Sequence, residues 1–250
     1  MDSSLASAAS TRFLDVGGTR FAYRRFGTPT GIPLVFTQHF MGNLDNFDPA
    51  ISDGLGLSTI DLLGHSMGGE IAQMLTLNRP DLVRRLVLVG TGPKGGDGMA
   101  RQDPKVAPLF SKWEELGEDM WLPIMFSPSN ESQDAGRAFI DRITARTEDR
   151  DIPVSTETIA AYLAAVHDWG APAQGSFDYL GGISQPTLVV NGNNDIIIPT
   201  VNSYHLFQHL PNAELWLLPD ANHGSHFQYV DRFVRRVIDF LDVQPHDLGS

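Results

Sequence analysis

The sequence predicts an α/β fold, in which a mostly parallel sheet has helices on both faces and a helical insertion over one edge. Two observations lead to this prediction. Short apolar runs alternate along the chain with segments of helical spacing, a pattern typical of parallel strands joined by crossover helices. Between about residues 100 and 175 this alternation stops, and three helical patterns follow one another without an intervening strand.

The expected strands and helices follow in order from the N-terminus. Two alternating runs flank Gly17-Gly18, which is typical of a β-hairpin. Short apolar runs then predict buried strands, bounded by glycine, proline or polar residues, at 32–40, 58–66, 83–90, 185–195 and 213–223. Helical spacing predicts a helix over 67–80, ended by Asn78 to Pro80, and a strongly amphipathic final helix over 226–241.

The insertion divides the expected core into two parts. Its helical patterns cover 105–126, 132–146 and 155–169. We therefore predict that residues 11–91 and 176–242 form the core, with residues 92–175 inserted over the carboxyl edge of its sheet. Residues 1–10 are small and polar without periodicity and are expected to be a disordered leader, and residues 243–250 a tail.

Composition argues against several classes of function. The 250 residues carry a formal net charge of -12 and no block of basic residues, which argues against nucleic-acid binding. The absence of cysteine excludes disulfides and thiolate metal sites. The N-terminus lacks a signal-peptide pattern, and no run reaches about 18 apolar residues, so we expect a cytoplasmic protein without a membrane span. The expected partner is a small-molecule substrate.

A serine between two glycines stands at the end of one expected strand. The segment Gly64-His65-Ser66-Met67-Gly68 matches G-x-S-x-G, in which a serine occupies a sharp turn from a strand to a helix. Side chains two positions before and after the serine would collide in so tight a turn, and glycine removes them. Ser66 would then project above the sheet, with the Met67 N–H at the helix N-terminus, where the dipole favours developing negative charge. The sequence therefore predicts a nucleophilic serine.

An acid and a base follow at the ends of two later strands. Asp195 ends the stretch "VVNGNND", and His223 ends the stretch "LLPDANH". The order Ser66, Asp195, His223 is one of the known chain orders of a nucleophile, an orienting carboxylate and a general base. Neutral His223 would accept the Ser66 proton, and Asp195 would hold the imidazole in the required tautomer.

Two neighbouring residues compete for these roles. Asp220 is on the same loop as His223, and from there it cannot easily reach around to the imidazole. His226 is an alternative base in the first turn of the final helix. We prefer His223, because it directly follows its strand.

The remaining histidines fit structural roles more readily. His205 and His209 stand at i and i+4 of a predicted helix, but no third ligand or glutamate lies nearby in the sequence, so we expect no metal site. His65 is expected to pack beside its strand. His167 either lines a substrate pocket or is structural.

In their order and spacing, four segments resemble the α/β-hydrolase superfamily, in its branch with a serine nucleophile, which includes esterases and cofactor-free haloperoxidases: "PLVFTQHFMGN", "LLGHSMGG", "PTLVVNGNND" and "DANHG". The likeness extends from about residue 12 to residue 242. It implies chemistry without a cofactor, a cap domain over 92–175, and an oxyanion hole formed by the N–H groups of Met67 and Phe40. The family usually has His-Gly where this chain has Gln38-His39, so the second donor is either Phe40 or Met41.

The resemblance also predicts a strand–helix unit that this sequence lacks. Similar hydrolases place roughly 35 to 45 further residues before the serine-bearing strand, whereas here "AISDGL" runs almost directly into "GLSTIDLL" near residues 53–58. The crossover that remains has about 20 residues, which is enough to place the strands at 32–40 and 58–66 side by side. An unbroken chain predicts that the hairpin pairs with the other edge of the first of these strands. An omitted segment predicts a gap in the sheet.

These observations predict a cofactor-free serine hydrolase. The resemblance implies that Ser66 attacks an acyl carbonyl and that water releases the acyl-enzyme. We expect a carboxylic ester or lactone of small to medium, apolar character, in a pocket lined by aromatic residues of the insertion: Phe110, Trp113, Trp121, Phe126, Tyr162 and Trp169. Haloperoxidase or perhydrolase activity and C–C bond hydrolysis are alternatives with the same triad. A small-ligand receptor on this fold is the alternative from another class.

Overall fold

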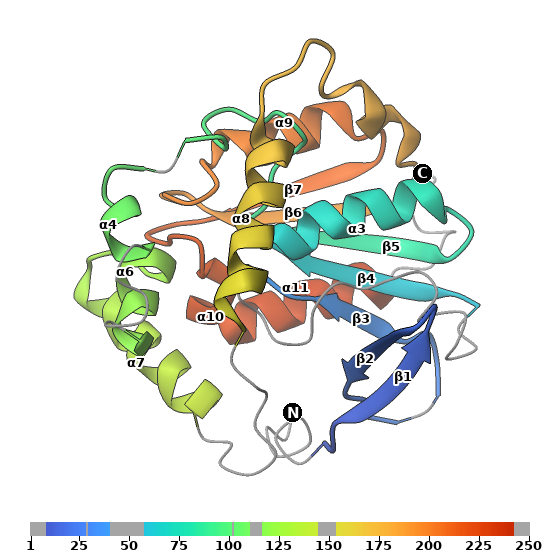
Figure 1. The fold of residues 1–250 in the computed structure, drawn as a ribbon, viewed down its shortest axis with the longest axis horizontal. Coiled ribbons are helices and arrows are strands. Elements are labelled where there is room, and N and C mark those ends of the chain that lie inside the picture. Colours follow the sequence, from blue (N-terminus) through green and yellow to red (C-terminus); the bar gives the residue numbers. More distant parts are fainter. Residues whose placement is uncertain are drawn as a thin grey trace.

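The centre of the molecule is a five-stranded parallel sheet (Figure 1). The computed structural model describes residues 9–28, 30–40, 58–101, 103–110, 117–144 and 154–242. The strands lie in the order β3-β4-β5-β6-β7 and comprise Leu34–Thr37, Ile60–His65, Val83–Val89, Thr187–Gly192 and Ala213–Leu218. All neighbouring pairs in this sheet are parallel, so the carboxyl ends of the strands meet at one edge. The predicted α/β fold is confirmed.

Helices cover both faces of this sheet through two separate apolar clusters. Figure 1 shows α3 (Met67–Asn78) in front of the sheet, where it packs with α9 (Val201–His209) against β4, β5 and β6. Behind the sheet, α11 (Val230–Asp242) supplies the second cluster with Phe233, Val237 and Phe240. Because both faces are covered, β4 and β6 are buried along their whole length, which explains their nearly continuous apolar sequences.

The part of the insertion that the structure describes is helical. It contains α4 (Ala107–Phe110), η1 (Gly117–Met120), α6 (Trp121–Met125), α7 (Asn130–Thr144) and α8 (Thr156–Gly170), and η2 (Asp178–Gly182) follows it before β6. The helical spacing of the sequence predicted this. Figure 1 shows α4, α6 and α7 beside the carboxyl ends of the strands. A third apolar cluster holds this region together around Met120, Ile124, Met125, Phe126 and Phe139.

The N-terminal hairpin forms as predicted but pairs differently. Strands β1 (Arg12–Val16) and β2 (Thr19–Tyr23) pair antiparallel around Gly17 and Gly18, whose φ values of 57° and 85° favour glycine. The hairpin is a two-stranded sheet of its own. Of the two alternatives, the pairing with β3 that an unbroken chain predicts is not seen for the described residues, whereas β3 does lie beside β4 as expected.

The physical reason for this difference lies in strand spacing. Two strands pair only when they lie about 4.8 Å apart. The hairpin does not pair with β3, and this break falls where similar hydrolases have the strand–helix unit that the sequence lacks. The join itself, residues 53–57, lies outside the described residues, and so do residues 1–8 of the expected leader and the expected tail. Within the described ranges, no helix has both the length and the apolar character needed to cross a membrane.

Candidate active site

Ser66 lies in a strained turn between β4 and α3. Its backbone has φ 58° and ψ -125°, a combination that costs energy for any residue with a Cβ and persists only where surrounding contacts impose it. A Cβ on Gly64 would lie 2.4 Å from the Gly68 carbonyl oxygen, and a Cβ on Gly69 would lie 2.5 Å from Thr91 Cγ2. The close approach of β4 and α3 therefore requires Gly64, as the motif predicts, and Gly69 leaves room for Thr91, which follows β5.

The end of β3 lies directly over the first turn of α3. Thr37 Oγ1 donates a 2.8 Å hydrogen bond to the Gly68 carbonyl oxygen, and a Cβ on Gly68 would lie 2.2 Å from the Thr37 carbonyl oxygen. The segment that follows β3, including Phe40, therefore begins beside the N-terminus of α3, where Met67 is the first helical residue. An anion beside Ser66 would face the positive end of this helix. Met41, the other candidate donor, lies outside the described residues.

His223 and Asp195 meet beyond the ends of β7 and β6. His223 Nδ1 lies 2.8 Å from Asp195 Oδ2, and the two side chains are only 3% and 0% exposed. Asp195 Oδ1 accepts hydrogen bonds from the backbone N–H groups of Ile197 and Ile198 at 2.8 and 3.0 Å. These bonds fix the carboxylate, so that its second oxygen accepts the Nδ1 proton and leaves Nε2 of a neutral imidazole as a proton acceptor.

The competing acid and base have other surroundings. Asp220 Oδ2 accepts a 2.5 Å hydrogen bond from Ser129 Oγ, and Asp220 has a φ of 48°. His226 is 8% exposed, and its Nδ1 atom has no hydrogen-bond partner among the described residues. In the described part of the chain, Asp195 is therefore the carboxylate that is hydrogen-bonded to His223, and no carboxylate is hydrogen-bonded to His226.

His223 belongs to a group of four neighbouring imidazoles, of which His65, His223 and His226 are buried and His39 is partly buried. The His65 ring lies 4.8 Å from the ring of His223 and 4.3 Å from that of His226, and His39 lies 5.4 Å from His65, all measured between ring centroids. Burial lowers the pKa of His39 to about 4 and that of His226 to about 3, and the neighbouring imidazoles contribute further. Burial likewise lowers the pKa of His65 well below its usual value. These three rings are therefore neutral at pH 7.

Two of these histidines hold the backbone of the site. His65 Nε2 donates to the His223 carbonyl oxygen at 3.1 Å, so the residue before Ser66 is bonded to the main chain of His223. His39 Nδ1 donates to the Phe40 carbonyl oxygen at 2.6 Å. In the sequence, His39 stands out only as a departure from the family pattern, and His65 is expected to pack beside its strand. Their hydrogen bonds depend on tertiary contacts, which no local pattern reveals.

Glu70 is a buried carboxyl group that sequence reasoning did not identify. It is 5% exposed, Oε1 has no hydrogen-bond partner among the described residues, and burial raises its pKa to about 8. One helical turn further, Gln73 accepts a 2.7 Å hydrogen bond from the Tyr179 hydroxyl and donates a 3.2 Å bond to the Gly92 carbonyl oxygen. An acidic residue in the first turn of a helix is common, so its identity alone gave no signal of burial.

Two of the predicted pocket aromatics lie beside the segment that follows β3. The Trp121 ring contacts the His39 ring edge to face at 5.3 Å, and the Tyr162 ring contacts Phe40 at 6.2 Å. Since Trp121 is in α6 and Tyr162 in α8, both come from the insertion. The insertion therefore places aromatic surface beside the segment that follows β3.

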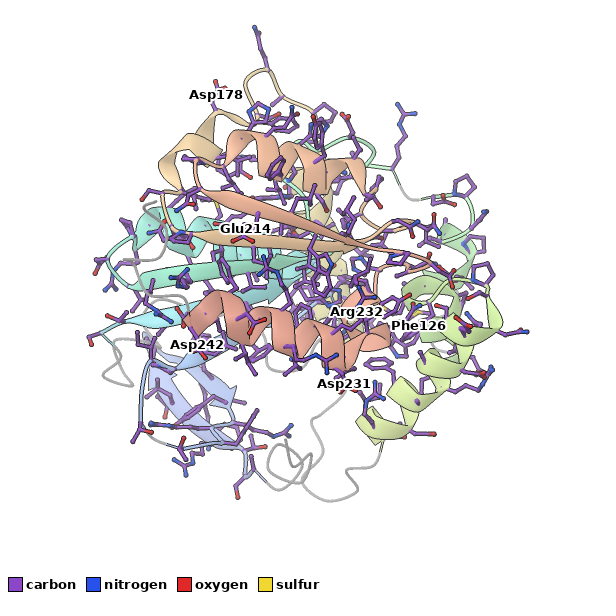
Figure 2. All side chains as sticks on the ribbon, turned by 180° about the vertical axis from the view of Figure 1, so that it is seen from behind. Phe126, Asp178, Glu214, Asp231, Arg232 and Asp242 are labelled. Atoms are coloured by element: carbon purple, nitrogen blue, oxygen red, sulfur yellow. The ribbon has the colours of Figure 1, made fainter. Side chains whose placement is uncertain are left out.

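The other predicted aromatics are placed differently. Phe126 is 1% exposed and packs 5.8 Å from Phe139 inside the third apolar cluster, where the insertion meets the chain before α11 (Figure 2). Trp169 Nε1 donates to the Gly92 carbonyl oxygen at 3.3 Å. The Phe110 side chain and Trp113 lie outside the described residues. Among the predicted aromatics that the structure describes, Trp121 and Tyr162 thus have contacts beside the segment that follows β3.

The surface histidines take part in ordinary contacts. His205 Nε2 lies 3.1 Å from Asp97 Oδ2, and the rings of His205 and His209 both contact Phe177, at 5.0 and 5.2 Å. His167 is exposed on α8. Within the ranges that the structure describes, no group of three or more His, Cys, Asp or Glu side chains could hold a metal ion.

The chain matches known proteins over most of its length. A family model described as the alpha/beta hydrolase family matches residues 3–236. Among solved structures, an alpha/beta hydrolase fold protein from Chitinophaga pinensis is 34% identical, covers 95% of this chain and 99% of its own, and has a TM-score of 0.85.

Two curated relatives are enzymes with different named reactions. The 2-hydroxy-6-oxononadienedioate/2-hydroxy-6-oxononatrienedioate hydrolase 1 of Dechloromonas aromatica is 27% identical over 194 residues, which are 76% of this chain and 64% of that protein. The pimeloyl-(acyl-carrier protein) methyl ester esterase of Nitrosomonas europaea is 29% identical over 203 residues, which are 78% of this chain and 75% of that protein. This chain therefore spans less than two thirds of the length of the first relative.

The family match extends over both parts of the core and the insertion between them, and the solved relative aligns over nearly its entire length. The geometry at Ser66 agrees with this match, because a strained turn from strand to helix is how this fold presents a nucleophile. The chain belongs to the alpha/beta hydrolase family.

Proposed function

We propose that this protein is a serine hydrolase that cleaves a carboxylic ester or lactone through an acyl-enzyme on Ser66. The observation that carries the proposal is the 2.8 Å contact between His223 Nδ1 and Asp195 Oδ2 beyond two neighbouring strands of the sheet that also carries the Ser66 turn. A buried carboxylate held by two backbone N–H groups orients the imidazole as a general base. Ser66 has the strained backbone of the turn that presents a nucleophile above the sheet in this fold.

In the proposed reaction, Ser66 Oγ attacks the acyl carbonyl carbon while His223 Nε2 takes the hydroxyl proton. The Met67 N–H and a second N–H from the segment after β3 stabilise the oxyanion. The tetrahedral intermediate then expels the alcohol, which receives the proton from His223. A water molecule attacks the acyl-enzyme in the same way, with His223 as the base, and releases the acid and free Ser66.

The surroundings of Ser66 support an apolar, uncharged substrate. Among the described residues, the rings of Trp121 and Tyr162 contact this segment after β3, which itself carries the neutral imidazole of His39. Such groups bury an alkyl or aryl acyl chain well, and these described side chains carry no positive charge for an acidic one. We propose that residues 92–175 form a cap that covers the acyl chain of the substrate.

Hydrolysis of a C–C bond is the second candidate reaction, because the first relative reported above is named a hydrolase of 2-hydroxy-6-oxo dioates. That reaction needs the same nucleophile and base but a carbon leaving group. A dioate carries two carboxylates, and burying them without cationic partners is costly. The neutral rings at the site therefore favour the ester or lactone.

Turnover of chromogenic p-nitrophenyl esters with acyl chains of two to eight carbons tests the proposal. We expect hydrolysis by the wild-type protein and a loss on the order of 10⁴-fold or more for Ser66→Ala, with an unchanged melting temperature. Residual Ser66→Ala activity within tenfold of wild type would remove Ser66 from the mechanism. A folded wild-type protein that binds these esters without cleaving them would instead favour a receptor.

A further inference from the structure

The loop that carries His223 is bonded to the insertion on both sides of the histidine. Before it, Asn222 Nδ2 donates to the Phe126 carbonyl oxygen at 3.1 Å, and Asn222 Oδ1 accepts from Ser127 Oγ at 3.3 Å. After it, the Gly224 N–H donates to the Met125 carbonyl oxygen at 2.8 Å. Three consecutive residues of the insertion, 125–127, thus hold the two neighbours of His223.

These contacts are buried and specific. Ser127 is 0% exposed, Phe126 1%, Met125 2% and Asn222 5%. A buried amide that loses its partners pays the cost of desolvation, so each bond favours one position of the loop over all others. A Cβ on Gly224 would lie 2.9 Å from the Met125 carbonyl oxygen, which shows how closely the two segments approach.

The core holds the same histidine from the opposite side. His65 Nε2 donates to the His223 carbonyl oxygen at 3.1 Å, and Asp195 accepts from its ring. The core thus holds the ring and the carbonyl group of His223, while the insertion holds the Asn222 side chain and the Gly224 N–H. A displacement of either support by about 1 Å would alter the direction of Nε2.

We propose that Asn222 is a positioning residue, through which insertion residues 125–127 keep His223 in line with Asp195 and Ser66. The catalytic effect of Asn222 rests on the proposed hydrolase function, whereas its effect on the position of His223 does not. The insertion then has two roles, since it supplies aromatic surface through Trp121 and also orients the general base. Insertion and base are coupled because Trp121 and Met125 belong to the same short helix, α6.

The test compares Asn222→Ala with Gln133→Ala. Gln133 is the matched control, because its side-chain amide also bonds this segment, donating to the Ser127 carbonyl oxygen at 2.9 Å, but it has no bond to the His223 loop. For Asn222→Ala we expect kcat for a p-nitrophenyl ester to fall roughly 10- to 100-fold with KM within twofold. For Gln133→Ala we expect both constants to stay within twofold. If Asn222→Ala does not fold, Ser127→Ala replaces it, with an expected three- to tenfold loss of kcat.

A second readout does not depend on activity. The His223 Nδ1 proton, hydrogen-bonded to Asp195, gives a low-field proton resonance that is assigned by its loss in His223→Gln. We expect this resonance in the wild type and in Gln133→Ala, and its broadening or loss in Asn222→Ala. An Asn222→Ala protein with wild-type kcat, or with this resonance unchanged, overturns the proposal. A wild-type protein that shows the resonance but cleaves no ester refutes the proposed function alone, and the resonance of Asn222→Ala then decides the positioning role.

Discussion

The hydroxyl of Ser66 is a poor nucleophile unless a neutral, oriented base lies beside it, and one carboxylate supplies that orientation. One oxygen of Asp195 accepts hydrogen bonds from two backbone N–H groups, and the other accepts a hydrogen bond from His223 Nδ1. Asp220, only three residues before His223 in the sequence, accepts from Ser129 Oγ instead. The position of an aspartate at the end of a strand thus identifies the partner of His223 better than its closeness to His223 in the sequence does.

Exchange of these two acids for their amides separates their roles. Asp195→Asn is expected to lower kcat on the order of 10⁴-fold, because an amide no longer selects the imidazole tautomer that leaves Nε2 free to accept a proton. Asp220→Asn is expected to lower kcat tenfold at most. Steady-state kinetics on one chromogenic ester measure both. A larger loss for Asp220→Asn would show that the assignment of the acid is wrong.

Glu70 makes the stability of the protein depend on pH. Its pKa is raised by burial from 4.5 to about 8, so between these values the folded state holds a proton that the unfolded state has lost. The free energy of unfolding should therefore fall as the pH rises through this window, by about 1.4 kcal/mol per pH unit, and level off above pH 8. Urea unfolding of wild type and Glu70→Gln measures it, and we expect the variant to lose this slope. A variant with the wild-type slope would contradict the assignment.

At the scale of secondary structure, the close contact between β3 and α3 determines where the oxyanion would lie. The first turn of α3 touches the backbone of β3 because Gly68 has no side chain. The motif predicted the glycine, but the partner on the other side, Thr37, could not be read from the sequence. It follows from the parallel pairing of β3 with β4, which brings residues about 30 positions apart together.

A methyl group at Gly68 tests this contact. Gly68→Ala would place a Cβ 2.2 Å from the Thr37 carbonyl oxygen, so the strand or the helix must shift. We expect a loss of about 1–3 kcal/mol in the free energy of unfolding and a fall in kcat of at least tenfold. Gly181→Ala is the matched control, because no atom lies within 4 Å of the added Cβ. Equal urea midpoints for the two variants would argue against a tight β3–α3 contact.

Local patterns predicted the strands, the hairpin, the α3 turn and the amphipathic α11, since each depends on residues close together in the sequence. The role of Phe126 was harder to predict, because an aromatic residue at helical spacing reads the same whether it lines a pocket or fills a core. The structure buries it. Asn222 has no local signature at all, since its partners Phe126 and Ser127 lie about 95 residues away.

At the scale of the whole molecule, buried imidazoles set the response to acid. Burial lowers the pKa values of His39, His65 and His226, so below about pH 6.5 the unfolded chain binds protons that the folded protein excludes. The stability that their neutral state contributes is present above pH 6.5. It is lost as the pH falls toward the pKa values that these histidines have in the folded protein. The cluster joins the end of β4 to the loop before α11, so acid should weaken the core near the site first.

His226→Phe tests this response. The substitution removes a titrating group whose Nδ1 has no described hydrogen-bond partner, so little bonding is lost. We expect the free energy of unfolding of the variant to fall less steeply than that of the wild type between pH 6.5 and 4, by about 1.4 kcal/mol per pH unit. Guanidinium unfolding at several pH values measures both slopes. Parallel curves for the two proteins would show that His226 is not neutral in the fold.

The central claim is that Ser66 is a nucleophile activated by His223, and covalent labelling tests it without knowledge of the natural substrate. An organophosphonate reacts with an activated serine and leaves a stable adduct, which peptide mass spectrometry locates. The account predicts one adduct per chain on Ser66, no adduct on Ser66→Ala, and labelling of His223→Gln at least 100-fold slower than wild type. A folded wild-type protein without an adduct on Ser66, or a His223→Gln protein labelled at the wild-type rate, would contradict it.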